Sequence, residues 1–565
     1  MVKMTQVKIP VKTILKVLPG QCSRHGTITN EEKELVLQAA SKSLGIPAGE
    51  IRNFVVRKKS LDARKKNNQE NNIYYIYHVE FNCNNEQKLV RCYGKNDVLF
   101  IPDSENEKYT RSIFTSGNNI NKDKHHVLVA GFGPAGIFAA LVLARAGLGP
   151  VVIERGKDVR ERQKITSRFW EGGELNPECN VQFGEGGAGT FSDGKLNTLV
   201  KDKDGYNRMV LNTLAEFGAP PEILYLQKPH IGTDRLADVV EAMRGEIIRL
   251  GGTVHFNTKL TNIIYKNGCI NGAKISKISG NGICGEEQEI KCTHLVLAIG
   301  HSARDTFYSL YGNGLYIEPK AFAVGVRVEH PQDIIGYSQY GSLYKNLPAA
   351  DYKLACKAKD GRGVYSFCMC PGGYVVNASS EPGHLAVNGM SNYARNGRNA
   401  NSAIVVTVSP EDFGGNGALA GIEFQRKWEE EAYRQADGKI PVQLFGDFCN
   451  NIKSTSFGEI MPDMKGGYML ANTRAALPAF VGNLVEEGIK NFGKKIKGYS
   501  REDVLVSGIE SRTSSPVRIN RDKDFQANIH GIYPCGEGAG YAGGITSAAA
   551  DGIRVALAVI NPLAQ

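Results

Sequence analysis

The chain has 565 residues, which is long enough for two or three domains, and carries a net charge of +10. With 42% hydrophobic and 22% charged residues, its composition is that of a globular protein and excludes a disordered chain. The N-terminus alternates lysine with apolar residues, so it predicts no signal peptide, and no apolar run is long enough to predict a membrane span. Twelve scattered cysteines favour the reducing cytoplasm over a disulfide framework.

The first 115 residues predict a small α+β domain of ferredoxin-like type. A strand is expected within residues 7–18, a helix over residues 31–44, and strands over residues 51–58 and 73–82. The polar stretch that follows, residues 116–124, predicts a linker.

This N-terminal region holds most of the excess positive charge, about +8 before residue 125. Two basic clusters stand out, Arg57-Lys58-Lys59 and Arg64-Lys65-Lys66. One interpretation is an ordinary solvated surface. The other is a contact surface for nucleic acid or for an acidic partner protein.

A dinucleotide-binding unit follows, and it starts the first part of the predicted nucleotide-binding domain, residues 125–319. An apolar strand, residues 126–130, leads into Gly131-Phe132-Gly133-Pro134-Ala135-Gly136, then a helix, and then a second strand that ends at Glu154. In such a turn the glycines allow the backbone to approach a pyrophosphate at the helix N-terminus. Glu154 is expected to bind a ribose hydroxyl, and Arg155 is a candidate for a phosphorylated ligand.

A second glycine segment, residues 184–195, also predicts contact with a flat or phosphorylated ligand, because so many glycines cost chain entropy unless the backbone touches something. A third lies in the C-terminal part, residues 501–565, where a glycine-rich turn opens a helix of small residues over 545–560. The contacts expected from these two segments and from the end of the strand at 293–300 are Gly186, Gly187, Ala188, Gly189, Thr190, Ser192, Lys195, Gly300, Gly536, Glu537, Gly543, Gly544 and Ile545.

Between the nucleotide-binding segments the pattern changes. Residues 320–500 contain several short alternating runs, which predict an antiparallel sheet, followed by helices over residues 419–435 and 477–492. The fold class expected is therefore α/β: a Rossmann-type FAD-binding domain with an inserted antiparallel-sheet cap and a small N-terminal α+β domain.

Returning for a last strand and helix resembles the Rossmann flavoproteins of the glutathione-reductase type. Four motifs resemble more specifically the bacterial FAD-dependent dehydrogenases described as NAD(FAD)-utilising: GEGGAGTFSDGKL, IGHSARDTF, ESRTSSPVRI and YPCGEGAGYAGGITSAAADG. The resemblance implies FAD and redox chemistry on an unidentified small molecule. It also implies that the turn at Gly536 contacts the ribityl chain, with Glu537 in place of the usual Asp, and that the helix opening at Gly543-Gly544 points its N-terminus at the flavin.

No second G-x-G-x-x-G follows a strand, so the sequence predicts no separate NAD(P)H-binding domain, and NAD(P)H is expected at most as a transient donor. The absence of C-x-x-C and C-x4-C near the flavin loops disfavours the redox-active disulfide reductases. Cys368-Met369-Cys370 is the only close cysteine pair, and without a second pair or a histidine cluster it predicts no metal site.

The catalytic candidates lie at expected domain junctions. Arg512 and Arg327 rank first, since an unsaturated acid substrate wants arginine partners. Lys195, His384 and Arg395 rank lower, and His301, in the segment His301-Ser302-Ala303-Arg304, is expected either to cap the next helix or to face the substrate. Two other functions stay open: a flavin-containing protein that binds or modifies RNA, and a flavin sensor without activity.

Overall fold

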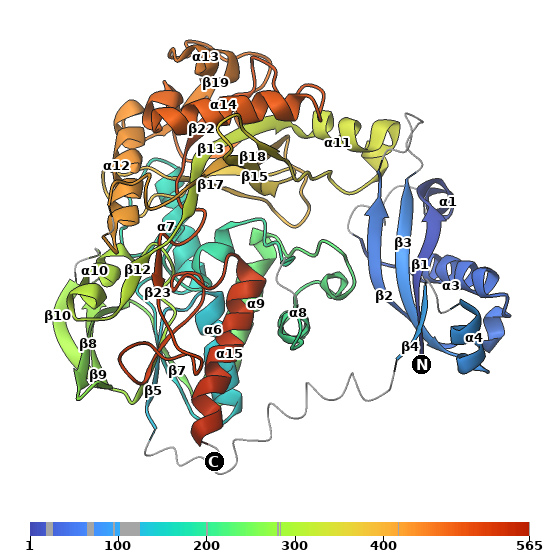
Figure 1. Ribbon diagram of the computed structural model, residues 1–565, viewed down its shortest axis with the longest axis horizontal. Coiled ribbons are helices and arrows are strands. Elements are labelled where there is room, and N and C mark those ends of the chain that lie inside the picture. The colour runs from blue at the N-terminus through green and yellow to red at the C-terminus, as the bar shows by residue number, and fades with distance from the viewer. Residues whose placement is uncertain are drawn as a thin grey trace.

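A computed structural model of the protein describes residues 1–18, 26–64, 73–93, 97–101, 125–198, 202–279, 282, 284–415 and 417–563. It has three parts: an N-terminal lobe, a parallel-sheet domain and a cap that stands above the parallel sheet in the view of Figure 1. The predicted linker, residues 116–124, lies outside the described residues.

The N-terminal lobe is ferredoxin-like, as the sequence predicts. Its four strands lie in the order β2-β3-β1-β4, and each neighbouring pair is antiparallel. The helices pack through an apolar face that includes Val36 and Ala40, and Thr29, not Asn30, caps the main helix by accepting a hydrogen bond from the Glu32 amide. The elements in order are β1 Val2–Pro10, α1 Val11–Val17, α3 Asn30–Leu44, β2 Arg52–Asp62, β3 Tyr74–Asn82, α4 Glu86–Tyr93 and β4 Val98–Phe100.

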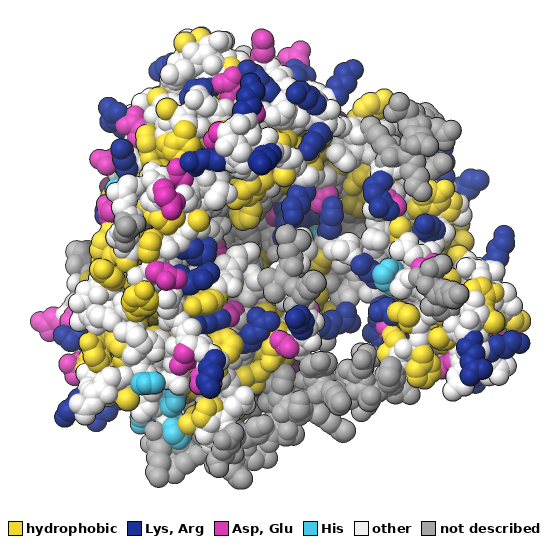
Figure 2. Space-filling view, viewed as in Figure 1, with side chains coloured by type: hydrophobic (Ala, Val, Ile, Leu, Met, Phe, Trp, Pro, Cys, Tyr) yellow, Lys and Arg dark blue, Asp and Glu magenta, His cyan; other side chains and the backbone are white. Residues whose placement is uncertain are grey.

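Two residues of the first basic cluster, Arg57 and Lys59, form ion pairs within the lobe. Lys59 is buried and forms an ion pair with Glu32 at 2.7 Å, and Arg57 pairs with Glu80 at 2.6 Å. Lys59 is therefore not part of a surface, contrary to the contact-surface interpretation, because strand alternation turns it inward. In the second cluster Arg64 pairs with Asp62, and Lys65 and Lys66 lie outside the described residues. On the face seen in Figure 2, Lys and Arg side chains stand out over the lobe and around the hollow beside it, with few Asp or Glu between them.

The same strand docks the lobe on the rest of the protein. The Lys59 amide donates to the Tyr225 carbonyl at 2.7 Å, and the Gln227 amide donates to the Lys59 carbonyl at 3.0 Å. Leu347 of the cap is buried in the apolar core of the lobe. Backbone bonds and apolar contacts thus both fix the N-terminal lobe against the other two parts.

The second part is a five-stranded parallel sheet in the order β24-β11-β5-β6-β7, with helices packed on it. Two segments far apart in the sequence build this sheet, because β24 comes from the last 35 residues and pairs with β11. The strands are β5 Val127–Ala130, β6 Val151–Ile153, β7 Thr253–His255, β11 His294–Leu297 and β24 Ile532–Pro534. The helices are α6 Pro134–Arg145, α7 Val159–Trp170, α8 Tyr206–Glu216, α9 Thr233–Arg249, α10 Arg304–Gly312 and α15 Ile545–Leu563.

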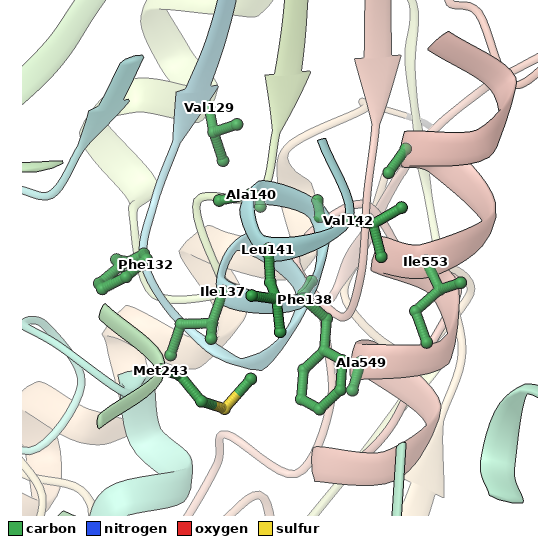
Figure 3. Packing of buried hydrophobic residues seen from close by; sticks show 14 of the residues in the cluster. Val129, Phe132, Ile137, Phe138, Ala140, Leu141, Val142, Met243, Ala549 and Ile553 are labelled. Atoms are coloured by element: carbon green, nitrogen blue, oxygen red, sulfur yellow. The ribbon is translucent and has the colours of Figure 1, made fainter. Parts of the chain in front are cut away.

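Helices α6 and α15 pack together in the core of this domain (Figure 3). Small residues allow the close approach: a Cβ on Gly552 would lie 2.2 Å from the Ala135 carbonyl oxygen. Figure 3 shows Phe138 and Val142 of α6 facing Ala549 and Ile553 of α15. The packing brings the N-termini of two helices that lie about 400 residues apart in sequence to one edge of the sheet.

A three-stranded antiparallel sheet beside the parallel one was only partly expected. Its strands are β8 Thr258–Lys266, β9 Cys269–Ile278 and β10 Cys284–Lys291. The sequence predicts part of the first strand only, because β10 is exposed along nearly its whole length and shows no apolar alternation.

The cap is built on a seven-stranded sheet in the order β14-β15-β18-β13-β22-β19-β21, antiparallel except between β19 and β21. Its last strand in sequence lies at residues 505–510, so the cap extends beyond the boundary expected at residue 500. The strands are β13 Phe322–Pro331, β14 Ala355–Lys357, β15 Gly363–Cys370, β18 Asn399–Val408, β19 Ile440–Leu444, β21 Tyr468–Leu470 and β22 Leu505–Glu510.

A small sheet, the cap helices and a two-stranded junction complete this part. The small sheet consists of β16 Tyr374–Asn377, β17 Val387–Met390 and β20 Met464–Lys465, and the junction pairs β12 Ile317–Pro319 with β23 Val517–Ile519. The helices are α11 Gln332–Tyr340, α12 Ala420–Gln435, α13 Phe445–Asn450 and α14 Ala479–Gly493. Among the described residues, no helix is both long and apolar enough to cross a bilayer.

Candidate cofactor and substrate site

A cavity of about 350 Å³ lies between the parallel-sheet domain and the cap, a size that falls within the range of ligand sites. Residues from all three glycine-rich segments line it on one side, and residues from the cap sheet line it on the other. Sequence-predicted residues that line it are Gly131, Gly133, Pro134, Ala135, Glu154, Arg155, Gly187, Ala188, Gly189, Ser192, Lys195, Gly300, His301, Arg512, Glu537, Gly543, Gly544 and Ile545.

The first part of the glycine-rich wall is the turn before α6. Gly131 has φ +97°, and a Cβ there would lie 2.3 Å from the Ala298 carbonyl oxygen, so only glycine fits. Gly133 caps the helix without a side-chain hydrogen bond, and Pro134 occupies the first helical position. The amides of the first turn therefore have no acceptor within the helix, and they face the cavity as an anion site.

The second part is the turn before α15. Gly543 and Gly544 face open space, since a Cβ on either would meet no atom within 4 Å. Gly189 packs on the same helix end, where its Cβ would lie 3.1 Å from Cγ1 of Ile545. Two helix N-termini thus converge on one cavity, and both favour negative charge in it. These positions fit a dinucleotide with an aromatic ring system, because the cradle is backbone that a side chain would fill.

Glu154 organises this wall as well as lining it. Its carboxylate accepts hydrogen bonds from the amides of Phe132 at 2.8 Å and of Gly156 and Gly184 at 2.9 Å each. Three loops are therefore tied to one side chain at the end of β6. Arg155 lies over the ring of Phe183 and pairs with Glu178 and Asp305.

Four residues expected to contact the cofactor, Gly136, Gly186, Thr190 and Gly536, do not line the cavity but support its wall. A Cβ on Gly136 would lie 2.0 Å from the Gly131 carbonyl oxygen, so this glycine lets the helix pack on the strand. The Gly536 amide donates to Asp551 at 2.8 Å, and Thr190 donates its hydroxyl to the Glu185 carbonyl at 3.3 Å. Sequence spacing does not distinguish such packing roles from ligand contact.

The cap side of the cavity is built from buried ion pairs. The Glu429 carboxylate accepts two hydrogen bonds from Arg512, at 3.0 and 2.8 Å, and two from Arg304, at 2.8 and 3.0 Å. The two arginines hold the pKa of this fully buried carboxyl well below its usual range. Arg512 also donates to Ser302 at 3.3 Å, so it connects the cap to the loop after β11.

Arg327, the other leading catalytic candidate, is fully buried and does not line the cavity. It donates to Glu510 at 2.8 Å and to the Cys368 carbonyl at 3.3 Å, and both of those residues do line the cavity. Direct contact with a bound molecule was expected, and this expectation is wrong. Strand β13 lies in the middle of the cap sheet, and the Arg327 side chain contacts Glu510 and Asn401 on the neighbouring strands. Arg327 thus reaches the cavity through Glu510 and Cys368.

The lower-ranked candidates separate in the same way. Lys195 lines the cavity, lies 3.3 Å from Asp193 and donates to the Met369 carbonyl. Arg395 does not line the cavity but also pairs with Asp193. His384 lies away from the site, with Nδ1 2.9 Å from the Pro382 carbonyl.

His301 is the side chain best placed to touch a bound molecule. It lines the cavity, and its buried Nε2 has no hydrogen-bond partner among the described residues, while Nδ1 lies 3.6 Å from Glu537. Burial, together with Arg512 and Arg304, lowers the pKa of His301 to about 3, so the ring is neutral. Burial raises the pKa of Glu537 to about 7. His301 does not cap α10, whose N-cap is Ala303.

Sequence reasoning missed Glu429, Asp193 and Cys368. Glu429 is one of several acids on a charged helix, and Asp193 is one polar residue in a glycine loop, so no local signal marks either. For Cys368, the short spacing to Cys370 was the one signal that could have marked the pair as part of the site.

Comparison with known proteins adds a family. Residues 321–513 match the family described as "FAD-dependent protein, C-terminal domain-like", and residues 1–82 match a domain family of unknown function. A protein of Clostridium beijerinckii described as uncharacterised is 49% identical over 526 residues, which cover 92% of this chain and 94% of that protein.

Two solved structures illustrate more distant likeness. A geranylgeranyl bacteriochlorophyll reductase-like protein from Thermoplasma acidophilum is 14% identical, with 76% of this chain and 77% of that chain covered and a TM-score of 0.33. A flavin-dependent brominase is 14% identical, with 78% and 79% covered and a TM-score of 0.34. At such scores neither enters the argument.

Proposed function

We propose that this chain, which belongs to the same family as the Clostridium beijerinckii protein, is an FAD-dependent oxidoreductase acting on a small organic molecule. The substrate would lie between the parallel-sheet domain and the cap, as in flavoproteins of the glutathione-reductase type that carry a cap in place of a second nucleotide domain. The match of residues 321–513 to a family described as FAD-dependent supports the cofactor.

One observation carries this proposal: the N-termini of α6 and α15 open into the same cavity. A Cβ on Gly536 would lie 2.7 Å from Cβ of Ala135, so the turns at residues 131–136 and 536–544 are in direct contact. Free amides at α6 suit a pyrophosphate, and the positive end of α15 suits the electron-rich edge of a reduced flavin. The glycines at 543 and 544 leave room there for a flat ring system.

Flavin, when bound, supplies the hydride or electron transfer, and the protein orients the substrate and moves protons. Arg512 is held by Glu429 with its guanidinium at the cavity surface, where it suits a carboxylate or carbonyl of the substrate. His301 offers Nε2 as a hydrogen-bond partner for the substrate, because the ring is neutral and this atom is buried and unpartnered among the described residues. Glu537 lies behind it and holds a proton near neutral pH.

The electron donor is proposed to reach the flavin from the cavity, since the sequence contains no second dinucleotide fingerprint. NADH and NADPH are the first donors to consider. A reducing, cytoplasmic location suits the chain, because all eleven cysteines of the described region are free thiols.

Anaerobic reduction of the FAD-loaded protein tests the proposal. A panel of donors, starting with NADH and NADPH, is mixed with the protein, and the loss of flavin absorbance is followed. At least one donor is expected to reduce the flavin within the time of catalysis. His301→Asn and Arg512→Lys are expected to keep the flavin and slow its reduction by about 10²-fold, the scale of one lost hydrogen-bond donor at the reacting group. A flavin that no donor reduces would identify a sensor instead.

A further inference from the structure

Cys368 and Cys370 lie at the end of β15, on the cap side of the same cavity. Cys368 lines the cavity and Cys370 is fully buried behind it. The pairing of β15 with β18 shifts by one residue between Phe367 and Cys370, so a β-bulge falls on the two cysteines. Bulges of this kind redirect side chains and are frequent beside active sites.

The bulge also sets the backbone conformation at the two cysteines. Cys368 adopts φ +41°, a conformation that non-glycine residues rarely take, and the Cys370 thiol donates to the Cys368 carbonyl at 3.4 Å. Residues two apart in an extended strand already point to the same side of the sheet. The observed contact puts the Cys370 sulfur against the Cys368 backbone, and a disulfide between the two would need Cα atoms about 4.4–6.8 Å apart.

Cations surround the pair. Arg327 donates to the Cys368 carbonyl at 3.3 Å, and Lys195 donates to the carbonyl of Met369, between the two cysteines. Acids lie on the same side, and their charges reach Cys368 as well: Asp193, Glu510 and Glu537. Asp193 is paired with Lys195 and Arg395, and Glu510 is paired with Arg327.

The pKa values of the two thiols shift in opposite directions. A hydrogen bond from the Cys370 thiol, with Lys195 and Arg327, lowers the pKa of Cys368 to about 5, whereas the pKa of Cys370 is raised well above its ordinary value by the same interaction and by burial. The exposed sulfur is thus a thiolate at neutral pH and the buried one a thiol, which is the arrangement needed for disulfide exchange.

We propose that Cys368 and Cys370 are a redox-active pair that exchanges two electrons with the flavin across this cavity, an inference that rests on the proposed function. In the oxidising direction, the Cys368 thiolate and the Cys370 thiol form one S–S bond and release one proton and two electrons. Oxidised flavin accepts the two electrons. In the reducing direction, two electrons from reduced flavin break the S–S bond, and one proton returns the pair to thiolate and thiol. Cys368 faces the flavin, and Cys370 is the resolving partner.

Reductive titration of the FAD-loaded protein under anaerobic conditions tests the pair. The oxidised protein is expected to take up about four electron equivalents per flavin, two for the flavin and two for the disulfide. Cys368→Ser and Cys370→Ser are each expected to take up about two. The control is Cys356→Ser, a half-buried thiol on β14 of the same sheet that does not line the cavity, and it should keep the wild-type value. Two equivalents in the wild type would overturn the proposal.

Mass spectrometry gives a second readout that does not use the flavin. The protein is equilibrated in dithiothreitol redox buffers, quenched with acid, labelled with N-ethylmaleimide in denaturant and digested. The peptide that contains both cysteines is expected to change from doubly labelled to unlabelled in one two-electron transition. Two labels at every potential would overturn the proposal.

The pH dependence of alkylation separates a thiolate from an ordinary thiol. The rate at which iodoacetamide modifies Cys368 is expected to level off above about pH 6, whereas the rate at Cys356 still rises at pH 8. Cys370→Ala removes the hydrogen-bond donor and should move the midpoint of the Cys368 alkylation profile to higher pH.

If the protein binds no FAD but the peptide with both cysteines still changes between its two labelling states, the proposed function fails and the pair remains. If donors reduce the flavin but the cysteines never oxidise, the pair alone fails.

Discussion

The two walls of the central cavity are built in opposite ways. The wall of the parallel-sheet domain presents backbone: glycines at Gly131, Gly133 and Gly544, with helix N-termini behind them. The cap wall presents side chains in buried ion pairs, such as Glu429 with Arg304 and Arg512. On the parallel-sheet wall, a side chain in place of a glycine would fill the cavity or clash with the backbone. On the cap wall, removing one charged partner would leave another buried charge unpaired.

The difference assigns the two walls different tasks. Backbone amides cannot change protonation, so they suit a cofactor that stays bound. Loops of the parallel-sheet domain also bring two side chains to the cavity, the neutral ring of His301 and the carboxyl of Glu537, whose pKa is near 7, and the cap adds a pair of cysteines. The Glu537 carboxyl and the two thiols can move protons or electrons. Changes to the first wall should therefore act on folding and flavin affinity, and changes to the second on reactivity and on the energy of buried charge.

The largest effect is expected from Gly131→Ala on the backbone wall. Its Cβ would lie 2.3 Å from the Ala298 carbonyl oxygen at φ +97°. Backbone strain of about 1–3 kcal/mol adds to overpacking of about 1–3 kcal/mol, so most of the stability should be lost and flavin with it. Chemical denaturation followed by circular dichroism measures this. A variant as stable as the wild type would show that the turn is not constrained.

The cap wall gives the next largest effect. Glu429→Gln leaves Arg512 buried without a counter-charge and Arg304 with Glu381 alone, which should cost about 3 kcal/mol of unfolding free energy, the lower end of the range because Glu381 stays and glutamine keeps an acceptor. Glu430→Gln, at an exposed position on the same helix, is the matched control and should cost less than about 0.5 kcal/mol. Equal losses of unfolding free energy in the two variants would mean that the buried ion pairs of Glu429 do not contribute to stability.

Gly543→Ala separates binding from folding on the backbone wall. A Cβ at this position meets no protein atom within 4 Å, so the thermal midpoint should stay unchanged. The same Cβ would occupy space proposed for the flavin, and the Kd for FAD should rise about tenfold, which is about 1.4 kcal/mol. Fluorescence titration with FAD measures the constant. An unchanged Kd would place the flavin elsewhere in the cavity.

The smallest effect concerns Glu537 and pH. Its pKa in the folded protein is raised to about 7 from an ordinary 4.5, so the folded state holds a proton that the unfolded state has already lost between those values. Stability therefore falls as pH rises from 4.5 to 7. Glu537→Gln should raise the unfolding free energy of the flavin-free protein at pH 8 by on the order of 1 kcal/mol and leave it unchanged at pH 4. A gain at both pH values would contradict the assignment.

The sequence predicts the backbone wall well and the cap wall poorly, and the reason is physical. Glycine positions such as Gly131 and Gly544 are set by local geometry, and a strand-turn-helix pattern is visible in a short window. The ferredoxin-like lobe and the Rossmann sheet follow from such patterns. Glu429 meets Arg512 across 83 residues, and Cys368 meets Lys195 across the domain boundary. Contacts of that kind are fixed by tertiary packing.

The same limit explains why β8–β10 were only partly predicted and why the cap was ended too early. Strand β10 is exposed along nearly its whole length and lacks apolar alternation, and β22 lies just after residue 500, at the start of the segment that the pattern assigns to the other domain. Arg327 was ranked by its position on a strand, but the direction of its side chain depends on the neighbours β18 and β22.

Flavin content is the most direct test of the central claim, that amides from both ends of the chain enclose one cofactor. The protein is purified, denatured with heat, and the released chromophore is measured against the protein concentration, with FAD added beforehand if the preparation is pale. About one FAD per chain is expected, bound as a dinucleotide and not as a mononucleotide, because the α6 turn suits the pyrophosphate. A colourless protein that takes up no FAD would contradict the account.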